Sequence, residues 1–260
     1  MKINELKLVY FSPTGTTRKV IMELAKNIDL KSVSFDLSIH KDKKPTLNFR
    51  NNDFVVFAAP VYSGRIPSTF TEYFENLKGD NTPCALAVTY GCREYEDALL
   101  ELKNEVEKRG FKVIGAAAFP TEHSLSRNIG SHRPNKDDLK VIDEFGVKLN
   151  RLLKQEKNFD NVDVKVPGNN PYRKPGSPSL LPKVDVELCT ECGECAKVCP
   201  TGAILADKPK KLDKKKCIGC LKCLRSCKQK ARYVSQRKQD SLDKKLMSVC
   251  DNNKQAESFF

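Results

Sequence analysis

The sequence has no long apolar run and no tryptophan. No stretch approaches the roughly 20 apolar residues of a membrane-spanning helix, and the N-terminal MKINELKLVYF lacks the apolar core of a secretory signal. We therefore expect no membrane span and a reducing, cytoplasmic environment. The Gly-x-Gly-x-x-Gly turn of dinucleotide-binding proteins is absent, and so is the Lys-containing Walker loop that binds nucleoside triphosphates.

Cysteine is abundant by contrast, and eight of the eleven cysteines form two matched runs. These are Cys189, Cys192, Cys195 and Cys199, followed by Cys217, Cys220, Cys223 and Cys227. The spacing of two, two and three residues is the one with which bacterial ferredoxins bind 4Fe-4S clusters, and the fourth cysteine of each run ligates the other cluster. We therefore predict one cluster on Cys189, Cys192, Cys195 and Cys227, and a second on Cys217, Cys220, Cys223 and Cys199. Gly193 and Gly219, inside the loops, would let backbone amides approach the cluster sulfurs.

Disulfides and zinc are the alternative uses of these cysteines. Disulfides require an oxidising compartment, for which the sequence gives no signal. Zinc sites pair two Cys-x2-Cys knuckles across a longer spacer, unlike four cysteines in eleven residues. Of the remaining cysteines, we expect Cys84 to be a small core residue, and Cys250 has no neighbours at ligand spacing. His40 and His132 are interpreted as solvated residues.

The N-terminal half alternates strand and helix patterns. Apolar, Val- and Phe-rich runs typical of buried strands occur at 6–11, 33–37, 54–59, 85–89 and 113–119. Helical patterns, with apolar residues three and four apart, occur at 16–28, 67–77, 94–109 and 137–153. This alternation predicts an α/β fold with a doubly wound parallel sheet and helices on both faces. Ligands of such sheets bind at the carboxyl ends of the strands.

The loop after the first predicted strand is rich in hydroxyl groups. Residues Ser12 to Thr17 read Ser-Pro-Thr-Gly-Thr-Thr and directly precede a helix. Hydroxyl donors, backbone N-H groups and a helix N-terminus together suit a phosphate dianion. Because the loop has no lysine, an FMN phosphate fits it better than a nucleoside triphosphate.

This loop resembles the phosphate loop of flavodoxins. Residues 59–67 (APVYSGRIP) and 89–95 (TYGCREY) resemble the two flavin-ring loops of the flavodoxin-ferredoxin fusion proteins of anaerobes. The resemblance covers residues 3 to about 155 and 183 to 235. It implies a flavodoxin-like, doubly wound five-stranded parallel sheet of order 2-1-3-4-5 and a second, smaller α+β ferredoxin-like domain.

The resemblance also implies bound FMN. Its phosphate would lie at Ser12, Thr14, Gly15, Thr16 and Thr17. Its ring would lie between Pro60, Val61, Tyr62, Ser63 and Gly64 on one side and Thr89, Tyr90, Gly91, Cys92, Arg93 and Tyr95 on the other.

Tyr62 and Tyr90 are the candidates to stack on the ring, since the chain has no tryptophan. Cys92 replaces an expected Asn, which leaves the local hydrogen bonding of the flavin open. Segment 119–124, after the fifth strand, is interpreted as a capping or loop segment, and a position at the rim of the flavin, which the resemblance favours, is the alternative.

These patterns predict four parts of the chain. Residues 1–157 form the FMN domain, 158–182 a Pro- and Gly-rich linker, 183–237 the ferredoxin domain, and 238–260 a polar C-terminal tail with helical potential at 242–249. Proline stiffens the linker, which limits the range of separations between the two domains.

The formal net charge is +13. An FMN phosphate and two oxidised clusters, each about −2, would lower it to about +7. Lysines between 208 and 216 and between 228 and 238 then leave a basic surface, either merely solvated or suited to steering an acidic redox partner. Nucleic acid is disfavoured, because only Tyr233 lies among the second group of basic residues.

The function predicted from the sequence is intracellular electron transfer. Clusters pass single electrons and a flavin handles one or two, so the chain would move electrons between two 4Fe-4S clusters and FMN and on to ferredoxin-like or oxidoreductase partners. No residue is singled out as a catalytic acid, base or nucleophile. Two alternatives stay open: an FMN-dependent reductase of a small acceptor such as a quinone, and an iron-sulfur redox or oxygen sensor. The electron donor, the acceptor and a homodimeric state are also open.

Overall fold

The computed structural model describes residues 2–39, 44–156 and 158–260, so His40 lies outside the described residues. Its centre is a parallel sheet formed by β1 (Glu5–Tyr10), β2 (Ser32–Asp36), β4 (Asp53–Pro60), β6 (Thr82–Tyr90) and β7 (Phe111–Pro120). The order across the sheet is β10-β7-β6-β4-β1-β2. The predicted doubly wound sheet of order 2-1-3-4-5 is therefore confirmed, with one additional strand at its edge.

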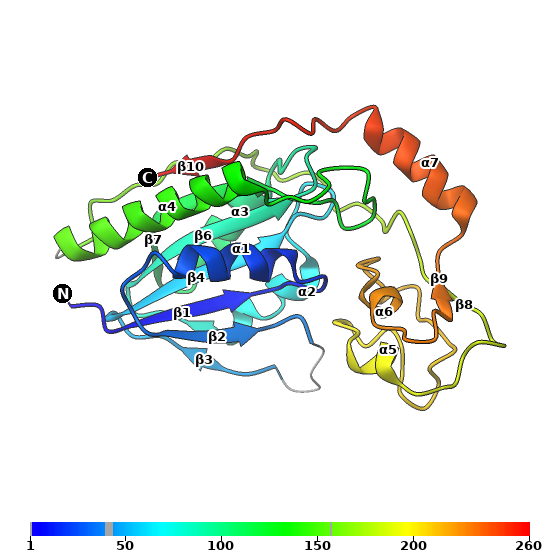
Figure 1. Cartoon of the computed structure of the whole chain (residues 1–260). Coiled ribbons are helices and arrows are strands. Elements are labelled where there is room, and N and C mark those ends of the chain that lie inside the picture. The colour runs from blue at the N-terminus through cyan, green and yellow to red at the C-terminus, as the bar shows by residue number, and fades with distance from the viewer. Residues whose placement is uncertain (1, 40–43, 157) are drawn as a thin grey trace.

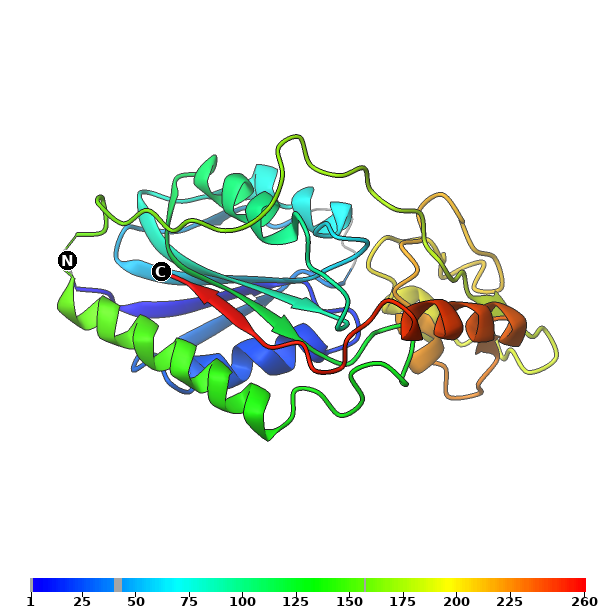
Figure 2. The same ribbon diagram turned by 90° about the horizontal axis from the view of Figure 1, so that it is seen from above.

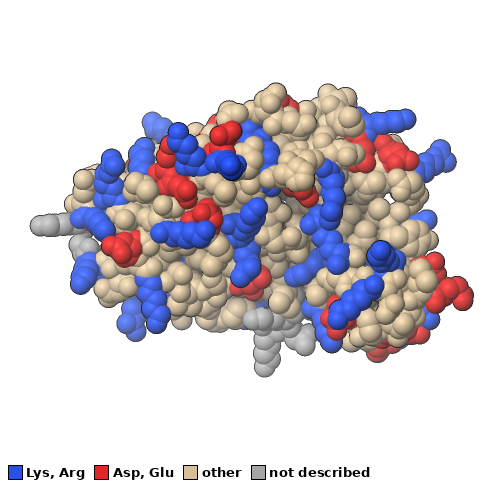
Figure 3. Space-filling model, viewed as in Figure 1, with Lys and Arg blue, Asp and Glu red and all other residues tan. Residues whose placement is uncertain are grey.

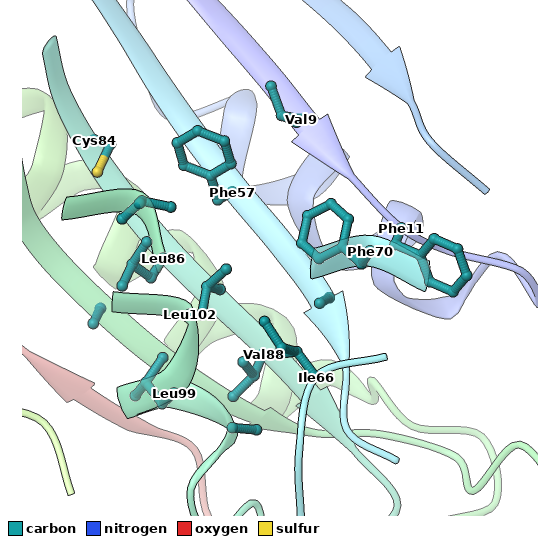
Figure 4. Close-up of a cluster of buried hydrophobic side chains, with 14 of the residues drawn as sticks. Val9, Phe11, Phe57, Ile66, Phe70, Cys84, Leu86, Val88, Leu99 and Leu102 are labelled. Atoms are coloured by element: carbon teal, nitrogen blue, oxygen red, sulfur yellow. The ribbon is translucent and has the colours of Figure 1, made fainter. Parts of the chain in front are cut away.

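Helices cover both faces of this sheet (Figures 1 and 2). Helices α1 (Thr16–Ala25) and α4 (Lys136–Gln155) pack on one face around Leu24, Ile142 and Leu149. The other face carries α2 (Ser68–Thr71), the 3-10 helix η1 (Phe74–Asn76) and α3 (Ala98–Glu107). Figure 4 shows the apolar cluster beneath them, including Phe57, Phe70 and the fully buried Cys84. Cys84 is thus the core residue that the sequence predicted.

The predicted helix at 67–77 is the one that differs most. Only α2 and η1 form there, because Leu77 and Lys78 leave the helical path as β5 (Leu77–Lys78). This strand pairs in parallel with β3 (Leu47–Asn48), outside the main sheet. By contrast, α4 extends one residue before and two beyond its predicted range of 137–153, because an Asn135–Asp138 capping box fixes its start.

The cysteine-rich part lies beyond the carboxyl ends of the parallel strands (Figure 1). Strands β8 (Lys183–Val184) and β9 (Arg232–Tyr233) pair antiparallel, which brings the two ends of this region together. Two short helices, α5 (Glu194–Lys197) and α6 (Lys222–Arg225), each contain the third cysteine of one run. The two cysteine runs are therefore arranged as two similar loop-helix units.

The segment 158–182 contains no helix or strand, as its prolines and glycines predict. It nevertheless packs on the sheet domain, since Phe159 and Val164 are buried. The Asp97 carboxylate accepts hydrogen bonds from the backbone N-H groups of Asn169, at 2.8 Å, and Arg173, at 2.7 Å. The segment therefore follows a fixed course along the domain.

The C-terminal tail returns from the cysteine-rich part to the sheet. Helix α7 (Gln236–Met247) leads to β10 (Glu257–Phe259), which pairs antiparallel with β7 (Figures 1 and 2). The Phe260 ring packs on Phe145 with 5.2 Å between ring centroids. Among the described residues, no helix has the length and apolarity needed to cross a membrane.

Candidate cofactor site

The loop Ser12 to Thr17 connects β1 to the N-terminus of α1. Gly15, the N-cap of this helix, has a φ of 87°, a left-handed conformation that favours glycine, and no side chain caps the helix. The backbone N-H groups of Thr16 and Thr17, the first two of α1, have no side-chain acceptor in the described structure, which suits an anion. The Ser12 hydroxyl accepts a hydrogen bond from the backbone N-H of Arg18 at 2.9 Å, so Ser12 also shapes the loop.

Thr17 and Thr89 hold this loop against the end of β6. Their hydroxyl oxygens are 2.7 Å apart, and both residues are buried. Because each hydroxyl is the other's hydrogen-bond partner, these two side chains connect the phosphate loop to the start of the second flavin-ring loop.

The first flavin-ring loop is a tight turn. The backbones of Tyr62 and Arg65 exchange hydrogen bonds of 2.9 and 3.2 Å, and Ser63 and Gly64 between them have positive φ values of 53° and 81°. The Arg65 guanidinium donates two hydrogen bonds, of 2.6 and 2.7 Å, to the buried carboxylate of Glu101. This pairing raises the pKa of Arg65. The loop is therefore fixed to α3 on its outer side.

Buried side chains hold the second flavin-ring loop in place. Tyr90 and Tyr95 are buried with their ring centroids 5.4 Å apart, and burial is the largest cause of the raised pKa of each phenol. Cys92 is fully buried, with its thiol 3.6 Å from the carbonyl oxygen of Thr121, and burial raises its pKa as well. Cys92 and Tyr95 therefore shape the loop.

A cavity of about 820 Å³ lies between the two flavin-ring loops and the second cysteine run. It is also bordered by α7, through Leu242, Lys245 and Leu246. Of the predicted flavin residues it is lined by Val61, Tyr62, Ser63, Gly64, Tyr90, Gly91 and Arg93, and from the cysteine-rich part by Cys217 and Gly219. Within the described chain, its lining does not include the phosphate loop, Pro60, Thr89, Cys92 or Tyr95.

Tyr62 connects the two sides of this cavity. Burial is the largest cause of its strongly raised pKa, and a negative charge on the nearby Cys220 sulfur raises it further. A tyrosine of the first flavin-ring loop therefore lies close to a predicted cluster ligand.

His123 and Ser124 also line the cavity, although their segment was interpreted from the sequence as a capping or loop segment. Burial lowers the pKa of His123 to about 4. The His123 Nδ1 accepts a hydrogen bond from the backbone N-H of Leu125 at 3.1 Å, so the hydrogen of the neutral ring is on Nε2. The only sign of this role in the sequence was a histidine shortly after the fifth predicted strand. The sequence could not show that this loop turns toward the cavity.

The cysteines gather around α5 and α6. The pKa values of Cys217, Cys220 and Cys223 are raised, to about 11 for Cys220 and about 12 for Cys223, mainly by burial and further by the charge of Cys199. Cys199 of the first run therefore lies beside the second run. Backbone N-H groups of Gly219 and Lys222 donate to the sulfurs of Cys217 and Cys220 and lower their pKa. Mostly buried, sulfur-only donors with amide support suit an iron-sulfur cluster.

The first run is more exposed. Cys195 is buried and receives a hydrogen bond from Arg232 at 3.7 Å, whereas Cys192 is exposed. Among the described residues, no three His, Cys, Asp or Glu side chains converge as the ligands of a single metal ion would. Each thiolate of a cubane cluster binds a different iron. The cysteines of such a cluster therefore do not converge on one point as the ligands of a single zinc ion do.

Comparison with known proteins identifies two domains. A flavodoxin domain model matches residues 7–104, and a 4Fe-4S binding domain model matches residues 182–205, which include the first cysteine run and end before the second. Pyruvate synthase subunit PorD of Methanocaldococcus jannaschii is 39% identical over 64 residues, 24% of this chain and 74% of PorD. Ferredoxin-1 of Rhodobacter capsulatus is 62% identical over 26 residues, 10% of this chain and 40% of that protein.

Solved flavodoxins superpose on the N-terminal part with low sequence identity. A flavodoxin from the domain Archaea has a TM-score of 0.42 and 13% identity, covering 58% of this chain and 99% of its own. Fusobacterium nucleatum flavodoxin bound to flavin mononucleotide has a TM-score of 0.42 and 16% identity, covering 57% and 98%. The two matched domain models and the ferredoxin relatives show that the chain belongs to the flavodoxin-ferredoxin fusion proteins, which are electron-transfer flavo-iron-sulfur proteins.

Proposed function

We propose that this protein binds one FMN and two 4Fe-4S clusters, exchanges electrons between them within one chain and passes them to redox partner proteins. The observation that carries the proposal is the cavity between the domains, which is lined by both flavin-ring loops and by Cys217 and Gly219 of the second cysteine run. A flavin ring in this cavity would lie against the cluster loop.

FMN is assigned to residues at the carboxyl ends of β1, β4 and β6. The uncapped N-terminus of α1 would bind the phosphate, and Tyr62 would stack on the ring. Tyr90, which is buried against Tyr95, would support the opposite loop. FMN supplies the capacity to accept either one or two electrons.

Each cluster is assigned three cysteines of one run and the last cysteine of the other. Helices α5 and α6 are in contact, and Cys195 and Cys223 belong to one apolar cluster, so the two runs are close enough for this exchange of ligands. By the same exchange of the fourth cysteine, the cluster at α6 would be bound by Cys199, Cys217, Cys220 and Cys223, and the other cluster would be bound by Cys189, Cys192, Cys195 and Cys227. Since Cys217 lines the cavity and Cys192 is exposed, the cluster at α6 would exchange electrons with FMN and the other with partners.

The proposed partner is an acidic protein, and the two proteins would meet in a reducing cytoplasm. Lys208, Lys210, Lys214, Lys215 and Lys216 lie between the two cysteine runs, and Figure 3 shows Lys and Arg over both parts of the viewed face. Positive charge around an exposed cluster accelerates association with a negatively charged partner, and salt weakens the effect. Association rates that fall with increasing salt concentration would support this partner type, whereas salt-independent rates would exclude it.

A reductase of a small acceptor is the second candidate. It is favoured by the cavity volume of about 820 Å³, which lies in the range of small-molecule sites. Multiple turnovers of a quinone with a saturable rate would establish it, and their absence would leave a carrier.

Composition tests the main proposal. Anaerobic purification followed by iron, sulfide, zinc and FMN determination should give about eight irons, about eight sulfides and about one FMN per chain. Zinc without iron would overturn the assignment of the cysteines. Iron without FMN, even after FMN is added, would overturn the assignment of the N-terminal domain.

A further inference from the structure

The segment after α7 makes backbone contacts with the second flavin-ring loop. The Asp251 N-H donates a hydrogen bond of 2.9 Å to the carbonyl oxygen of Cys92. The adjacent Cys250 thiol donates to the carbonyl oxygen of Gly91 at 3.6 Å. Two consecutive carbonyl groups of the loop are thus bound by the tail.

Side chains extend this contact along the loop. The Tyr90 hydroxyl donates to the carbonyl oxygen of Gln255 at 3.4 Å, and the Tyr95 hydroxyl donates to the Glu257 carboxylate at 2.9 Å. Lys254 forms an ion pair with Glu94. The tail therefore contacts the loop at positions from Tyr90 to Tyr95.

Asn252 connects the tail to a third segment, the loop after β7. Its side-chain oxygen accepts the backbone N-H of Gly130 at 2.8 Å, and its carbonyl oxygen accepts a hydrogen bond of 3.2 Å from Arg133. Arg133 also donates to the Cys92 thiol at 3.7 Å and forms a buried ion pair with Asp138. The tail, the second flavin-ring loop and the loop after β7 thus meet at one guanidinium.

Both ends of the tail segment are fixed. Leu246 of α7 packs in an apolar cluster with Cys92 and Ile129. Beyond the segment, Glu257 pairs with Ala118 of β7. Residues 250–257 therefore cross the back of the flavin-ring loop between two anchored points.

The loop needs such support because its backbone is unfavourable. Cys92 has a positive φ of 58°, and Glu96, directly after the loop, has one of 46°; this conformation is unfavourable for residues with a Cβ. Such conformations persist where surrounding contacts determine them. The hydrogen bonds that Asp251 and Arg133 donate to Cys92 are contacts of this kind.

We infer that residues 250–257 position the second flavin-ring loop, so that the FMN site is completed by a segment that follows the iron-sulfur region in the sequence. The inference rests on the proposed binding of FMN. The tail residues are positioning residues, because they act on the flavin through the loop.

Variants of two adjacent asparagines test this inference in the full-length protein. Asn252→Ala removes the acceptor of the Gly130 N-H, and Asn252→Asp retains an acceptor. Asn253→Ala is the matched control, because Asn253 is exposed and no hydrogen bond of its side chain amide is found in the described structure. Asn252→Ala should weaken FMN binding about five-fold, as expected for one lost hydrogen bond, and Asn252→Asp should restore it.

Three readouts separate positioning from a loss of folding. FMN affinity is measured by fluorescence quenching, the flavin environment by visible circular dichroism, and the mobility of residues 90–95 by hydrogen exchange in FMN-free protein. Asn252→Ala should change all three without lowering the iron content. Glu257→Ala, at an exposed position, is the second probe and should also speed exchange in the loop.

If Asn252→Ala and Glu257→Ala both match Asn253→Ala in every readout, the inference is overturned while the proposed function stands. If the wild-type protein binds no FMN, the proposed function fails. Hydrogen exchange in the FMN-free variants then still decides whether the tail holds the loop.

Discussion

The Arg225 guanidinium donates a hydrogen bond of 3.0 Å to the carbonyl oxygen of Ser124. Arg225 ends α6, in the second cysteine run, and Ser124 lines the cavity beside the flavin-ring loops. The neighbouring carbonyl of Leu125 accepts a hydrogen bond of 2.7 Å from Gln239 of α7. The cysteine-rich part and the sheet domain, which would hold the clusters and FMN, are thus joined by direct contacts as well as by the chain that connects them.

Removal of the Arg225 contact should slow electron exchange between the domains. Loss of one hydrogen bond costs about 1 kcal/mol, so Arg225→Ala should lower the rate about five-fold by reducing the docked population. Stopped-flow absorbance at flavin and cluster wavelengths measures this rate. Arg237→Ala, at an exposed residue of α7, is the control. An unchanged rate in Arg225→Ala would show that this contact does not hold the domains.

Substitution of Tyr62 tests ring stacking. Tyr62→Ala should weaken FMN binding about five-fold, since stacking contributes about 1 kcal/mol, whereas Tyr62→Phe should retain the affinity. Fluorescence titration gives the dissociation constants. Tyr233→Ala provides the control, because Tyr233 lies exposed on β9. Equal affinities for Tyr62→Ala and Tyr62→Phe would place the flavin elsewhere.

The exchange of ligands between the cysteine runs predicts a cross-over in cluster loss. Cys199→Ala should alter the same EPR signal as Cys223→Ala, because both would ligate the cluster at α6, and Cys227→Ala should alter the other signal. Each variant should lose up to about four of about eight irons. Cys84→Ala, in the core, should leave the iron content unchanged. Loss of the other signal in Cys199→Ala would contradict the assignment.

The low pKa of His123 predicts a loss of stability in acid. The pKa of His123 is about 6.5 in the unfolded chain and about 4 in the folded protein. Between these two pH values the unfolded chain binds a proton that the folded protein does not. The contribution of His123 is therefore complete above pH 6.5 and is lost as the pH falls toward 4, by up to about 3 kcal/mol. Asp243 and Arg93 face the ring with opposite effects, the first raising and the second lowering its pKa.

The comparison of His123→Asn with the exposed His132→Asn isolates this contribution. Urea unfolding between pH 7 and 5 should show a weaker pH dependence for His123→Asn only. Any pH dependence of iron binding cancels in the difference. Identical slopes for the two variants would mean that His123 is protonated or exposed in the folded protein.

Much of the fold was predictable from local patterns. The five apolar runs correspond to β1, β2, β4, β6 and β7. Buried parallel strands leave a continuous apolar signal, as in β4 and β6, whereas the edge strand β2 is only partly buried. The cysteine spacing predicted the cluster loops for a similar reason: the ligands of one loop are close in the sequence. Each of these features is encoded within about ten residues.

The features that were missed depend on distant contacts. Strand β10 has only three residues, Glu257–Phe259, and its pairing with β7 gives no periodic signal. The cavity combines loops after β4, β6 and β7 with Cys217 and α7, so no single segment predicts it. The sequence left the role of Cys92 open, and only the structure shows that its thiol contacts Thr121 and Arg133.

The most direct test of electron exchange within one chain is its dependence on protein concentration. Clusters reduced rapidly under anaerobic conditions should pass electrons to FMN at a first-order rate that stays constant over a hundred-fold range of concentration. A rate that rises in proportion to protein concentration would mean that the exchange occurs between molecules and would contradict the account.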